Sequence, residues 1–535
     1  MFSQLPLRAV GIAAALAMCL ATSGCTSLGE YLRNGFKVGP NYRKPPAPVA
    51  DEWIDSRHQG VDVSTKDLAG WWHALRDPKL DALVEQAYQQ NLTLRTAGTR
   101  ILAARAQRNI AIGYLFPQQQ QAFGDYRRTQ TSLNVANPLH RDIAGVGGFG
   151  DRTFNDTAAG VNLAWEIDFW GRFRRGIEAS NAALDASVEN YDDALVLLIG
   201  EVASTYVEIR VFQQQLRYVA DNIAVQEILA KQAEDRLQGG AGRKIDQAQM
   251  RSNLRDTLAI KEQLEISLRQ ANNRLCVLLG MPVRDLMPEL GDGPIPTVPP
   301  EVAVGMPVDL LRRRPDLRRA ERLVAAQSAR IGIATADLYP RLSLIGSIGY
   351  ESTGLNNLVT PNSFIGSVGP SLRWDILNYG RLVNGIRVQD ALFQTAAVEY
   401  QNAVLQAGRE VEDNIVFFLR SQTRTRELSV SAKEAKIAVD EAVALSKDVK
   451  FDLNQAFVTS NFLVGQQNKL AQAQGDIALS FVQIYKALGG GWEIRLQPRP
   501  PMLDAPVERF PAPPPQPVLP MGAKMIAPVA RGATP

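Results

Sequence analysis

Two regions of this chain alternate apolar residues with small or polar ones at the two-residue period of a β-strand. The first region carries its apolar series at Thr157, Ala159, Val161, Leu163, Trp165 and Ile167. About eleven residues is the length that a tilted strand needs to cross a membrane. The pattern therefore predicts a membrane-spanning strand, although a soluble sheet with one buried face would show the same alternation.

The second region repeats the pattern in two strands, over residues 341–351 and 364–376. Its series comprises Leu342, Leu344, Gly346, Ile348 and Tyr350, then Phe364, Gly366, Val368, Leu372, Trp374 and Ile376, with Ile345 as the exception. A partner for the first strand is placed by symmetry over residues 118–128, which alternate poorly. We therefore expect two β-hairpins, 118–168 and 341–376. Aromatic residues gather near the expected strand ends, as they do at membrane interfaces: Tyr114, Phe116, Trp165, Phe169, Trp170, Tyr339 and Tyr379.

Each hairpin leads into a long helical pattern. Residues 172–238 contain no helix breaker other than Gly176 and Gly200, so one helix of about 67 residues, roughly 100 Å long, is expected. Apolar residues recur every seven positions, as in a coiled-coil seam: Leu195, Val202, Ile209, Leu216 and Ile223, with Val404, Val411 and Phe418 in the second region. Returning helices, at about 245–279 and 461–488, complete two long helical hairpins over 171–280 and 380–488.

The two regions are copies of one segment. Four pairs of identical residues lie 209 positions apart: Trp165 and Trp374, Gly171 and Gly380, Tyr191 and Tyr400, Val202 and Val411. Upstream, Leu115-Phe116-Pro117 matches Leu338-Tyr339-Pro340 at 223, so the first β-hairpin is longer by 223 − 209 = 14 residues. We place the extra residues in the Gly-rich segment 137–150, as an external loop. A repeat of this size predicts a pseudo-symmetric shell instead of one pocket in one core.

Four strands cannot close a membrane barrel, because lipid would leave the edge strands without hydrogen-bond partners. Three copies would supply twelve strands, an even number that can enclose a pore. The expected fold class is a membrane α+β protein with an internal tandem duplication. Each chain would give four strands to a trimeric twelve-stranded transmembrane β-barrel, and the family resemblance described below implies that the long coiled-coil hairpins form a periplasmic α-barrel.

The rest of the chain flanks or joins the repeats. The expected organisation is a signal peptide (1–24), an extended N-terminal segment (25–70), a first repeat (71–280), a Pro/Gly-rich linker (281–308), a second repeat (309–492) and a disordered Pro-rich tail (493–535). Within the first repeat, Asp77 and Pro78 are suited to start a helix that runs from about Lys79 to Ile112.

The N-terminus reads as a targeting segment. Arg8 precedes an apolar run, residues 9–20, that is too short to span a bilayer. The run ends in Ala21-Thr22-Ser23-Gly24-Cys25, which resembles the lipobox of bacterial lipoproteins, although Thr22 stands where Leu is usual. The resemblance implies a diacylated Cys25 as the mature N-terminus, and Thr26 implies sorting to the outer membrane. The alternative is an ordinary signal peptide with a chance cysteine.

Composition argues against other classes of function. The net charge of +3 does not fit a nucleic-acid-binding surface. Three His and three Cys in 535 residues leave little for metal or nucleophile chemistry. Glu166, Asp168 and Asp375 lie in the strand pattern, where solvation in a channel is a simpler explanation than hydrolysis. We expect no enzyme activity, no cofactor and no metal site.

Four stretches carry a resemblance to a known family: VGPNY (38–42), WW…LRDPKLDALVEQAYQQN (71–91), LRRRPDLRRAERLVAAQSARIGIATADLYP (311–340) and YKALGGGW (485–492). Together they resemble the TolC-like outer-membrane efflux factors, in their lipid-anchored NodT branch. The resemblance covers nearly all of residues 25–492. It implies a homotrimeric exit duct in the outer membrane of a Gram-negative bacterium. The duct would receive toxic compounds from an inner-membrane pump of the RND type through a periplasmic adaptor.

The resemblance also implies a closure at the periplasmic tips of the helical hairpins. RLQGGAGRKID (236–246) fits the family's turn and puts Asp246 at the acidic position. The second copy departs, since Ser460, Asn461 and Val464 stand where acidic residues often occur. Asp246 and Asn461 are the candidate gate residues. A three-fold ring of Asp246 carboxylates would bind cations, whereas a solvated aspartate beside Arg243 is the plainer reading.

Two other functions stay open on the sequence. One is a structural envelope lipoprotein that uses its coiled-coil hairpins as a scaffold. The other is the outer-membrane duct of a type I protein secretion system, because a wide duct leaves the choice of cargo to the pump.

Overall fold

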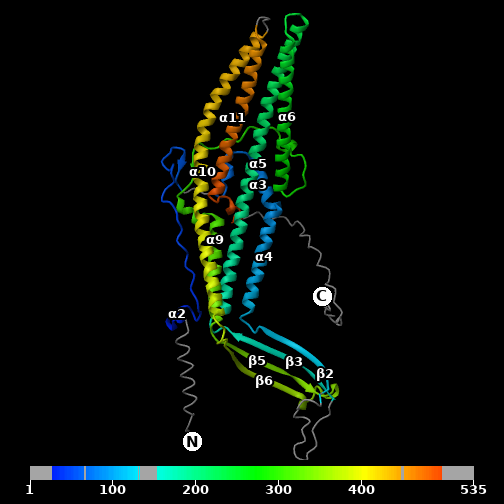
Figure 1. The fold of residues 1–535 in the computed structure, drawn as a ribbon, viewed down its shortest axis with the longest axis vertical. Helices are drawn as coiled ribbons and strands as arrows, with labels where there is room; N and C mark the ends of the chain where they lie inside the picture. The colour runs from blue at the N-terminus through cyan, green and yellow to red at the C-terminus, as the bar shows by residue number, and fades with distance from the viewer. Residues whose placement is uncertain (1–26, 65–67, 131, 133–152, 447–450, 497–535) are drawn as a thin grey trace, which may run out of the picture. The chain divides into compact units, whose positions relative to one another are not determined.

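The computed structural model describes residues 27–64, 68–130, 132, 153–446 and 451–496. Its main sheet contains four strands: β2 (Gln119–Gln130), β3 (Thr153–Ile167), β5 (Arg341–Ser352) and β6 (Phe364–Arg373). They form an antiparallel sheet in the order β2-β3-β5-β6. The sheet lies at one end of the long helices (Figure 1). Both predicted β-hairpins are therefore present.

The register of the sheet confirms the predicted alternation. Leu163 in β3 lies opposite Gly346 in β5, which lies opposite Val368 in β6. Because side chains alternate between faces, the predicted apolar series of β3 and β5, and that of β6 as far as Leu372, falls on one face of the sheet. Ile345, the predicted exception, lies opposite Ala164 and therefore belongs to the other face. Across β3, β5 and β6 one face is thus apolar and the other is mainly small and polar, whereas β2 places Gln120, Gly124 and Arg128 on the apolar side.

Strand β6 is shorter than predicted. We expected a strand to residue 376, whereas β6 ends at Arg373. The equivalent residues in β3, Trp165 to Ile167, pair only with β5, because β2 reaches no further than Ala164. β6 is an edge strand with no neighbour on that side among the described residues. The last three residues therefore lack the hydrogen bonds that make their counterparts a strand.

One of the 14 extra residues of the first hairpin is not where we predicted it. In the two hairpins Gln120 faces Leu163, and Leu342 faces Leu372. Strands β2 and β5 are thus offset by 342 − 120 = 222, against 223 for the helices before them. The inserted residue is Gln118, whose side chain accepts from the Glu166 backbone N–H at 2.6 Å and donates to the Glu166 carbonyl at 3.1 Å. The segment 137–150 lies outside the described residues.

Six helices make up the body of the protein. They are α4 (Leu92–Gly113), α5 (Arg172–Gln238), α6 (Lys244–Leu278), α9 (Pro315–Ala336), α10 (Arg381–Leu445) and α11 (Leu453–Ala487). Next to the sheet, α4, α5, α9 and α10 pack in that order, and beyond the midpoint α6 packs on α5 while α11 packs between α5 and α10 (Figure 1). The long helix over 172–238 is confirmed.

The two copies of the repeat agree more exactly in the limits of their helices than in their amino-acid residues. α4 and α9 begin and end 223 residues apart, and α6 and α11 begin and end 209 apart. Gly171 and Gly380 precede α5 and α10 at φ angles of 82° and 78°. This left-handed conformation favours glycine and turns each chain from the sheet into its helix.

The predicted seam is buried over its central part. Leu195, Val202 and Ile209 have no exposed surface, and neither have Val411 and Phe418 in the second copy. Leu216 and Ile223, nearer the tips, are only partly buried. The heptad pattern is therefore confirmed as the packing face of the long helices.

Two helix boundaries were predicted wrongly. The helix expected over 79–112 is two helices, α3 (Pro78–Gln90) and α4, because Asn91 is extended and its side chain caps α4 by accepting from the Leu94 N–H at 2.8 Å. The last return helix begins at Leu453 and not near Asn461, because the Asp452 side chain accepts from the Asn454 N–H and starts it. As predicted, Asp77 caps α3 and Pro78 opens it.

Short elements complete the described chain: α2 (Leu28–Arg33), β1 (Val61–Asp62), η1 (Trp71–Leu75), α7 (Met287–Leu290), β4 (Val302–Ala303), η3 (Pro307–Asp309), α8 (Leu310–Arg313), η4 (Leu355–Asn357), η5 (Pro361–Ser363) and η6 (Trp492–Leu496). β1 and β4 form a separate parallel pair. Among the described residues, none of the helices has a stretch apolar and long enough to span a bilayer.

Candidate functional site

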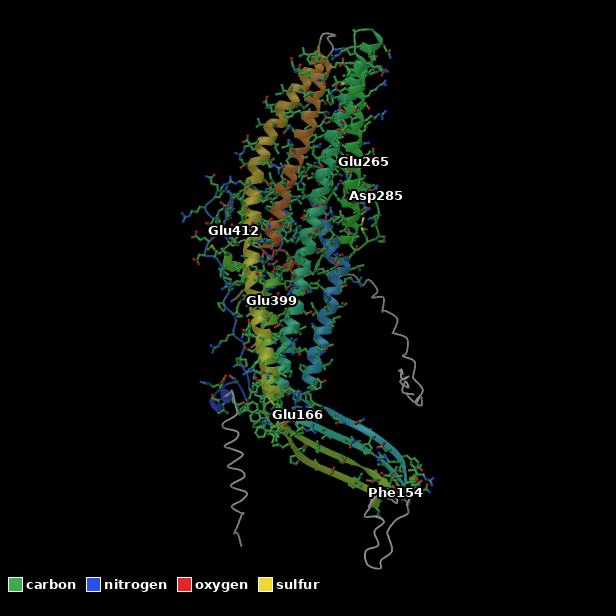
Figure 2. All side chains as sticks on the ribbon, in the orientation of Figure 1. Phe154, Glu166, Glu265, Asp285, Glu399 and Glu412 are labelled. Atoms are coloured by element: carbon green, nitrogen blue, oxygen red, sulfur yellow. The ribbon has the colours of Figure 1, made fainter. Side chains whose placement is uncertain are left out.

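The sheet presents a polar face suited to line a watery passage. Asn162 in β3 lies opposite Gln121 in β2 and Ser347 in β5, and Ser347 shares a hydroxyl hydrogen bond of 3.0 Å with Ser367 in β6. Figure 2 shows Glu166 where the sheet meets the helices and Phe154 at the far end of the sheet. Glu166 forms an ion pair with Arg172 at 3.2 Å. This acidic residue therefore has a structural partner at the base of the sheet.

The junction between sheet and helices is built twice by the same contact. The Trp165 indole N–H donates to the Leu115 carbonyl at 3.1 Å, and the Trp374 indole N–H donates to the Leu338 carbonyl at 2.9 Å. In each copy, the tryptophan at the end of the second strand thus holds the end of the helix that precedes the first strand. The identical spacing in the sequence signalled these residues, although their hydrogen bonds could not be inferred from it.

Two of the sequence motifs that carried the resemblance, RRPDL and ALGGGW, meet at the middle of the long helices. Arg314, of the RRPDL motif, donates to Asp316, to Glu410 on α10 at 2.8 Å and to the Ala487 carbonyl at 2.6 Å. Burial would lower the pKa of the Arg314 guanidinium, but Asp316 and then Glu410 outweigh it and raise that pKa. Arg314 thus joins the start of α9 to α10 and to the end of α11.

A second arginine of the motif links three further parts. Arg318 pairs with Glu189 and with the fully buried Asp192 on α5, and its guanidinium lies 4.5 Å from the ring centroid of Trp492. Trp492 closes the ALGGGW motif. The two motifs, about 170 residues apart in the chain, are therefore in direct contact, and we call the contacts of Arg314 and Arg318 the joint.

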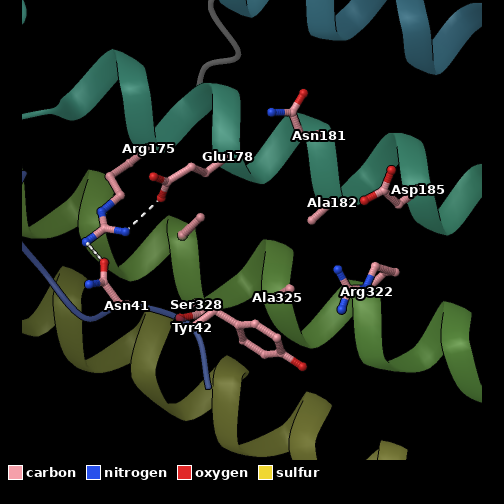
Figure 3. Close-up of a pocket in the computed structure, with 11 residues that line it drawn as sticks. Asn41, Tyr42, Arg175, Glu178, Asn181, Ala182, Asp185, Arg322, Ala325 and Ser328 are labelled. Atoms are coloured by element: carbon pink, nitrogen blue, oxygen red, sulfur yellow. Dashed lines mark hydrogen bonds and ion pairs between the residues drawn. The ribbon is translucent and has the colours of Figure 1, made fainter. Parts of the chain in front are cut away.

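The N-terminal segment lies along α5 and α9 and closes a pocket of about 310 Å³ (Figure 3). Arg175, buried on α5, donates to the Gly39 carbonyl at 2.9 Å and to Asn41 at 3.1 Å. Gly39 has φ 79°, and a Cβ there would come within 2.5 Å of the Gly332 Cα on α9. The backbone of the segment thus passes directly over α9, where only glycine fits.

Tyr42 continues this attachment. Its hydroxyl donates to Glu321 at 3.2 Å, and Glu321 also pairs with Lys44 at 2.9 Å. Burial, followed by the charge of Glu321, raises the pKa of the Tyr42 hydroxyl. Burial would raise the pKa of the Glu321 carboxyl as well, but hydrogen bonds from Lys44 and Arg322 outweigh it and lower that pKa. These interactions of Tyr42, Lys44, Glu321 and Arg322 hold the N-terminal segment on α9, and we call them the clasp.

At the helical tips, Asp246 forms an ion pair with a residue of its own hairpin. Arg243 donates to its two carboxylate oxygens at 2.9 and 2.8 Å. The hydrogen bond and charge of Asp246 raise the pKa of Arg243, and Asp452 adds to the rise. These residues line a cavity of about 230 Å³ between the two tips.

Asp452 is the acidic residue of the second tip, and the sequence analysis missed it. The signal was an Asp followed by a helical pattern, but we expected that helix to begin later. Arg236 on α5 joins the tips by donating to the Phe451 carbonyl at 2.8 Å and the Ser446 carbonyl at 2.7 Å. The structure therefore gathers Arg236, Arg243, Asp246 and Asp452 around one cavity.

Asn461 does not lie in this cluster. Its side chain accepts from Gln226 on α5 at 3.1 Å, within the helix pair below the tip. Since α6 and α11 align at 209, the counterpart of Asp246 is Gln455 and not Asn461. Cys25 lies outside the described residues, and its lipidation stays a prediction. Across the residues that are described, no group of three His, Cys, Asp or Glu side chains could hold a metal ion.

Known proteins resemble this chain along most of its length. Nodulation protein T of Rhizobium leguminosarum bv. trifolii is 29% identical over 87% of this chain and 97% of that protein. The toluene efflux pump outer membrane protein TtgI of Pseudomonas putida is 28% identical over 86% of this chain and 96% of its own length.

The fold also recurs in solved structures. The outer-membrane channel OprN has a TM-score of 0.77 and 29% identity, with 85% of this chain and 99% of that chain covered. The Campylobacter jejuni CmeC outer membrane channel, at 22% identity, shares the fold with a TM-score of 0.77, over 86% of this chain and 96% of that one. The outer membrane efflux protein family matches residues 83–281 and 306–490. With its duplicated strand-and-hairpin fold, the chain belongs to the outer membrane efflux protein family.

Proposed function

We propose that three copies of this outer membrane efflux protein close a twelve-stranded barrel and work as a passive exit duct. The helical hairpins would continue the passage into the periplasm. An adaptor and an inner-membrane pump of the RND type would deliver the cargo and supply the energy. The chain itself would carry out no chemistry.

The sheet is the observation that carries this proposal. Across β3, β5 and β6 it has one apolar face and one mainly small and polar face, and the outer sides of its edge strands, β2 and β6, are unpaired among the described residues. A sheet of this kind is stable in lipid only when its edges are joined and its apolar face is turned outward. Four strands are too few to close on themselves, and three copies satisfy both conditions.

The cargo we propose is small toxic compounds. Relatives of similar identity are named for efflux of toluene and of solvents, and others for pyoverdine export. The joint at Arg314 and Arg318 and the clasp at Tyr42 make the middle of the duct rigid. Selection of cargo would therefore lie with the pump and not with the duct.

The tips are the proposed gate. Asp246 would take part through its pair with Arg243, and Arg236 would hold the two tips of one chain together. Asn461 would contribute only by stiffening the helix pair through Gln226. Contact with the adaptor would open the tips by replacing these interactions.

A lipid on Cys25 would fix the duct at the inner leaflet. The described chain begins two residues later, and it is held at the junction of sheet and helices by the Tyr31 hydroxyl, which donates to the Phe169 carbonyl at 2.8 Å. Labelling with radioactive palmitate tests this anchor, with Cys25→Ser as the control.

A deletion strain tests the function. We expect it to become sensitive to solvents and hydrophobic drugs, and the wild-type gene to restore resistance. Pull-down from the complemented strain should recover a periplasmic adaptor. Unchanged sensitivity across the panel, together with a monomeric protein in detergent, would overturn the proposal.

A further inference from the structure

The pocket between the N-terminal segment, α5 and α9 takes no part in the proposed duct (Figure 3). Its volume of about 310 Å³ is suited to a small ligand. Ala182 on α5 and Ala325 and Ala329 on α9 are buried residues that line the pocket, and their short side chains leave the space open. Most of the other residues around this space are polar or charged.

One buried polar group in the pocket has no partner. Ser328 on α9 is 3% exposed, and its hydroxyl forms no hydrogen bond with another described residue. A helical serine can donate to the carbonyl four residues before it, as Ser180 on α5 does to Gly176 at 2.9 Å, but Ser328 does not. A buried hydroxyl without a partner costs free energy. Because Ser328 lines the pocket, a molecule bound there would satisfy it.

Two opposite charges face each other across the pocket without an ion pair. Figure 3 shows Asp185 on α5 across from Arg322 on α9. Arg322 donates to Glu321 at 2.5 Å through one nitrogen, whereas Asp185 forms no hydrogen bond or ion pair with a described residue. Burial would lower the pKa of the Arg322 guanidinium, but Glu321 outweighs it and raises that pKa, and Tyr42 and Asp185 add to the rise. Asp185 therefore acts on Arg322 through space and does not bond to it.

Asn181 on α5 adds a further donor. Its side-chain oxygen accepts from Arg108 at 2.6 Å, and its amide N–H groups have no partner among the described residues. Together with Arg322 and Ser328, Asn181 offers donors for an anionic group. Asp185 offers acceptors for a cationic group.

The other charged pair of the pocket is already satisfied. Arg175 donates to Glu178 at 2.7 Å and to the Gly39 carbonyl at 2.9 Å, and Glu178 also pairs with Lys37. These residues therefore serve as a wall that attaches the N-terminal segment. The groups left for a ligand are one set of donors around a cation and one carboxylate.

We propose that this pocket binds a small zwitterion of the α-amino acid type. The carboxylate of the ligand accepts from Arg322, Asn181 and Ser328. Its ammonium group donates to Asp185. The guanidinium suits a carboxylate because its nitrogens donate in parallel. A ligand with one charge would leave one of the two facing side chains without a partner, so a zwitterion is favoured over a plain acid or amine.

The place of the pocket favours a free solute over a lipid headgroup, although phosphoethanolamine is also a zwitterion. Asp185 lies 185 − 172 = 13 residues beyond the start of α5, which is about 20 Å along the helix. A headgroup layer is only about 5–8 Å thick. With the sheet in the membrane, as proposed above, the pocket therefore lies beyond the headgroups. Only this choice of source rests on the proposed function.

Binding is expected to hold the N-terminal segment more firmly, because Asn41 and Tyr42 of that segment line the same pocket. Limited proteolysis measures this effect. L-alanine or L-glutamine should slow cleavage of the segment in the wild-type protein and should have no effect on Asp185→Asn.

Calorimetry on the full chain in detergent tests the site directly, with L-alanine and L-glutamine as probes. Propionate and ethylamine serve as the singly charged analogues, and each is expected to bind about tenfold or more weakly than alanine. Ser328→Ala and Asp185→Asn should each raise the Kd of the amino acids about tenfold, since each removes a hydrogen bond to a charged group. Neither should change the unfolding midpoint without ligand, because neither side chain bonds to another described residue.

Lys44→Gln is the matched control. It removes an ion pair of the clasp from a residue that does not line the pocket, so it should bind alanine as the wild-type protein does. The absence of binding by both amino acids would overturn the site, and so would wild-type affinity in both Ser328→Ala and Asp185→Asn. Equally tight binding of propionate would overturn the zwitterion.

Phosphatidylethanolamine nanodiscs distinguish the two sources. We expect them to give the segment no protection that Asp185→Asn abolishes. Such protection, with no binding of either free amino acid, would overturn the solute in favour of a headgroup. None of these results bears on the trimer, which detergent gels measure without ligand, so this inference and the proposed function can fail separately.

Discussion

At the scale of single residues, a few buried or partly buried arginines hold the protein together. Arg314 and Arg318 satisfy carboxylates and carbonyls from α5, α10 and α11, and Arg175 holds the N-terminal segment. The sequence showed Arg314 and Arg318 as motif residues but gave no signal for Arg175. The partners of these arginines across the molecule lie 96 or more residues away in the chain, so their roles could not be predicted.

Arg314→Ala is expected to lower the free energy of unfolding by about 2 kcal/mol, because it leaves Glu410 and a helix-end carbonyl without their charged donor. Urea denaturation followed by circular dichroism measures the loss. The control is Arg319→Ala, whose more exposed side chain pairs with Asp193 at 3.8 Å and donates to Asn190 at 2.7 Å, and which should cost about 1 kcal/mol or less. Equal losses would contradict the role given to Arg314.

Acid is expected to release the N-terminal segment. The pKa of Glu321 is lowered in the folded protein, so its pairs with Lys44 and Arg322 stabilise the fold above the pKa of an unfolded glutamate, about 4.3. That stabilisation is lost as the pH falls through the lower, folded pKa. Limited proteolysis at pH 7 and near pH 3 should show faster cleavage of the segment in acid.

Glu321→Gln serves as the control for this pH dependence. Its segment should be cleaved faster already at pH 7 and should respond less to acid. A variant with the full acid response of the wild-type protein would refute the clasp.

At the scale of elements, local patterns predicted most of the fold. Alternation placed three of the four strands, and the lack of strong helix breakers between residues 172 and 238 gave the limits of α5. The boundaries that we predicted wrongly are those that a single side chain or a neighbouring strand determines. Asn91 divides a helical pattern through its own cap, Asp452 starts α11 early, and Gln118 is inserted before β2. The end of β6 depends on pairing that a single chain does not provide.

The two faces of β3 should respond oppositely to charge. Leu163→Arg puts a cation on the apolar face, which costs about 2–4 kcal/mol near the middle of a bilayer, and should abolish assembly in the outer membrane. Asn162→Arg, on the neighbouring residue and the polar face, should assemble normally. Membrane fractionation and trimer gels measure both. Normal assembly of Leu163→Arg would favour the coiled-coil scaffold over the barrel.

At the scale of the whole molecule, the duplication accounts for the two β-hairpins and the two long helical hairpins. The copies are alike along the helices and differ at the tips, where Arg243 and Asp246 in one correspond to Asp452 and Gln455 in the other. We could not predict this correspondence because it depends on where α11 begins. At the tips, α6 therefore begins after the basic Arg243 and α11 begins after the acidic Asp452, and both residues line one cavity.

Arg236→Ala should loosen the tips, since it removes two hydrogen bonds to the second hairpin. We expect cells that carry it to admit a large hydrophilic antibiotic that the outer membrane normally excludes. Arg251→Ala, which removes only an exposed ion pair with Glu234, should leave uptake unchanged. Equal uptake by the two variants would contradict a gate at this position.

Electron cryo-microscopy of the full-length protein in lipid nanodiscs tests the central claim most directly. The account predicts three copies around one axis, with twelve strands closed across the bilayer and β6 of each copy paired to β2 of the next. Particles that contain a single copy, or a sheet with free edges outside the lipid, would contradict it.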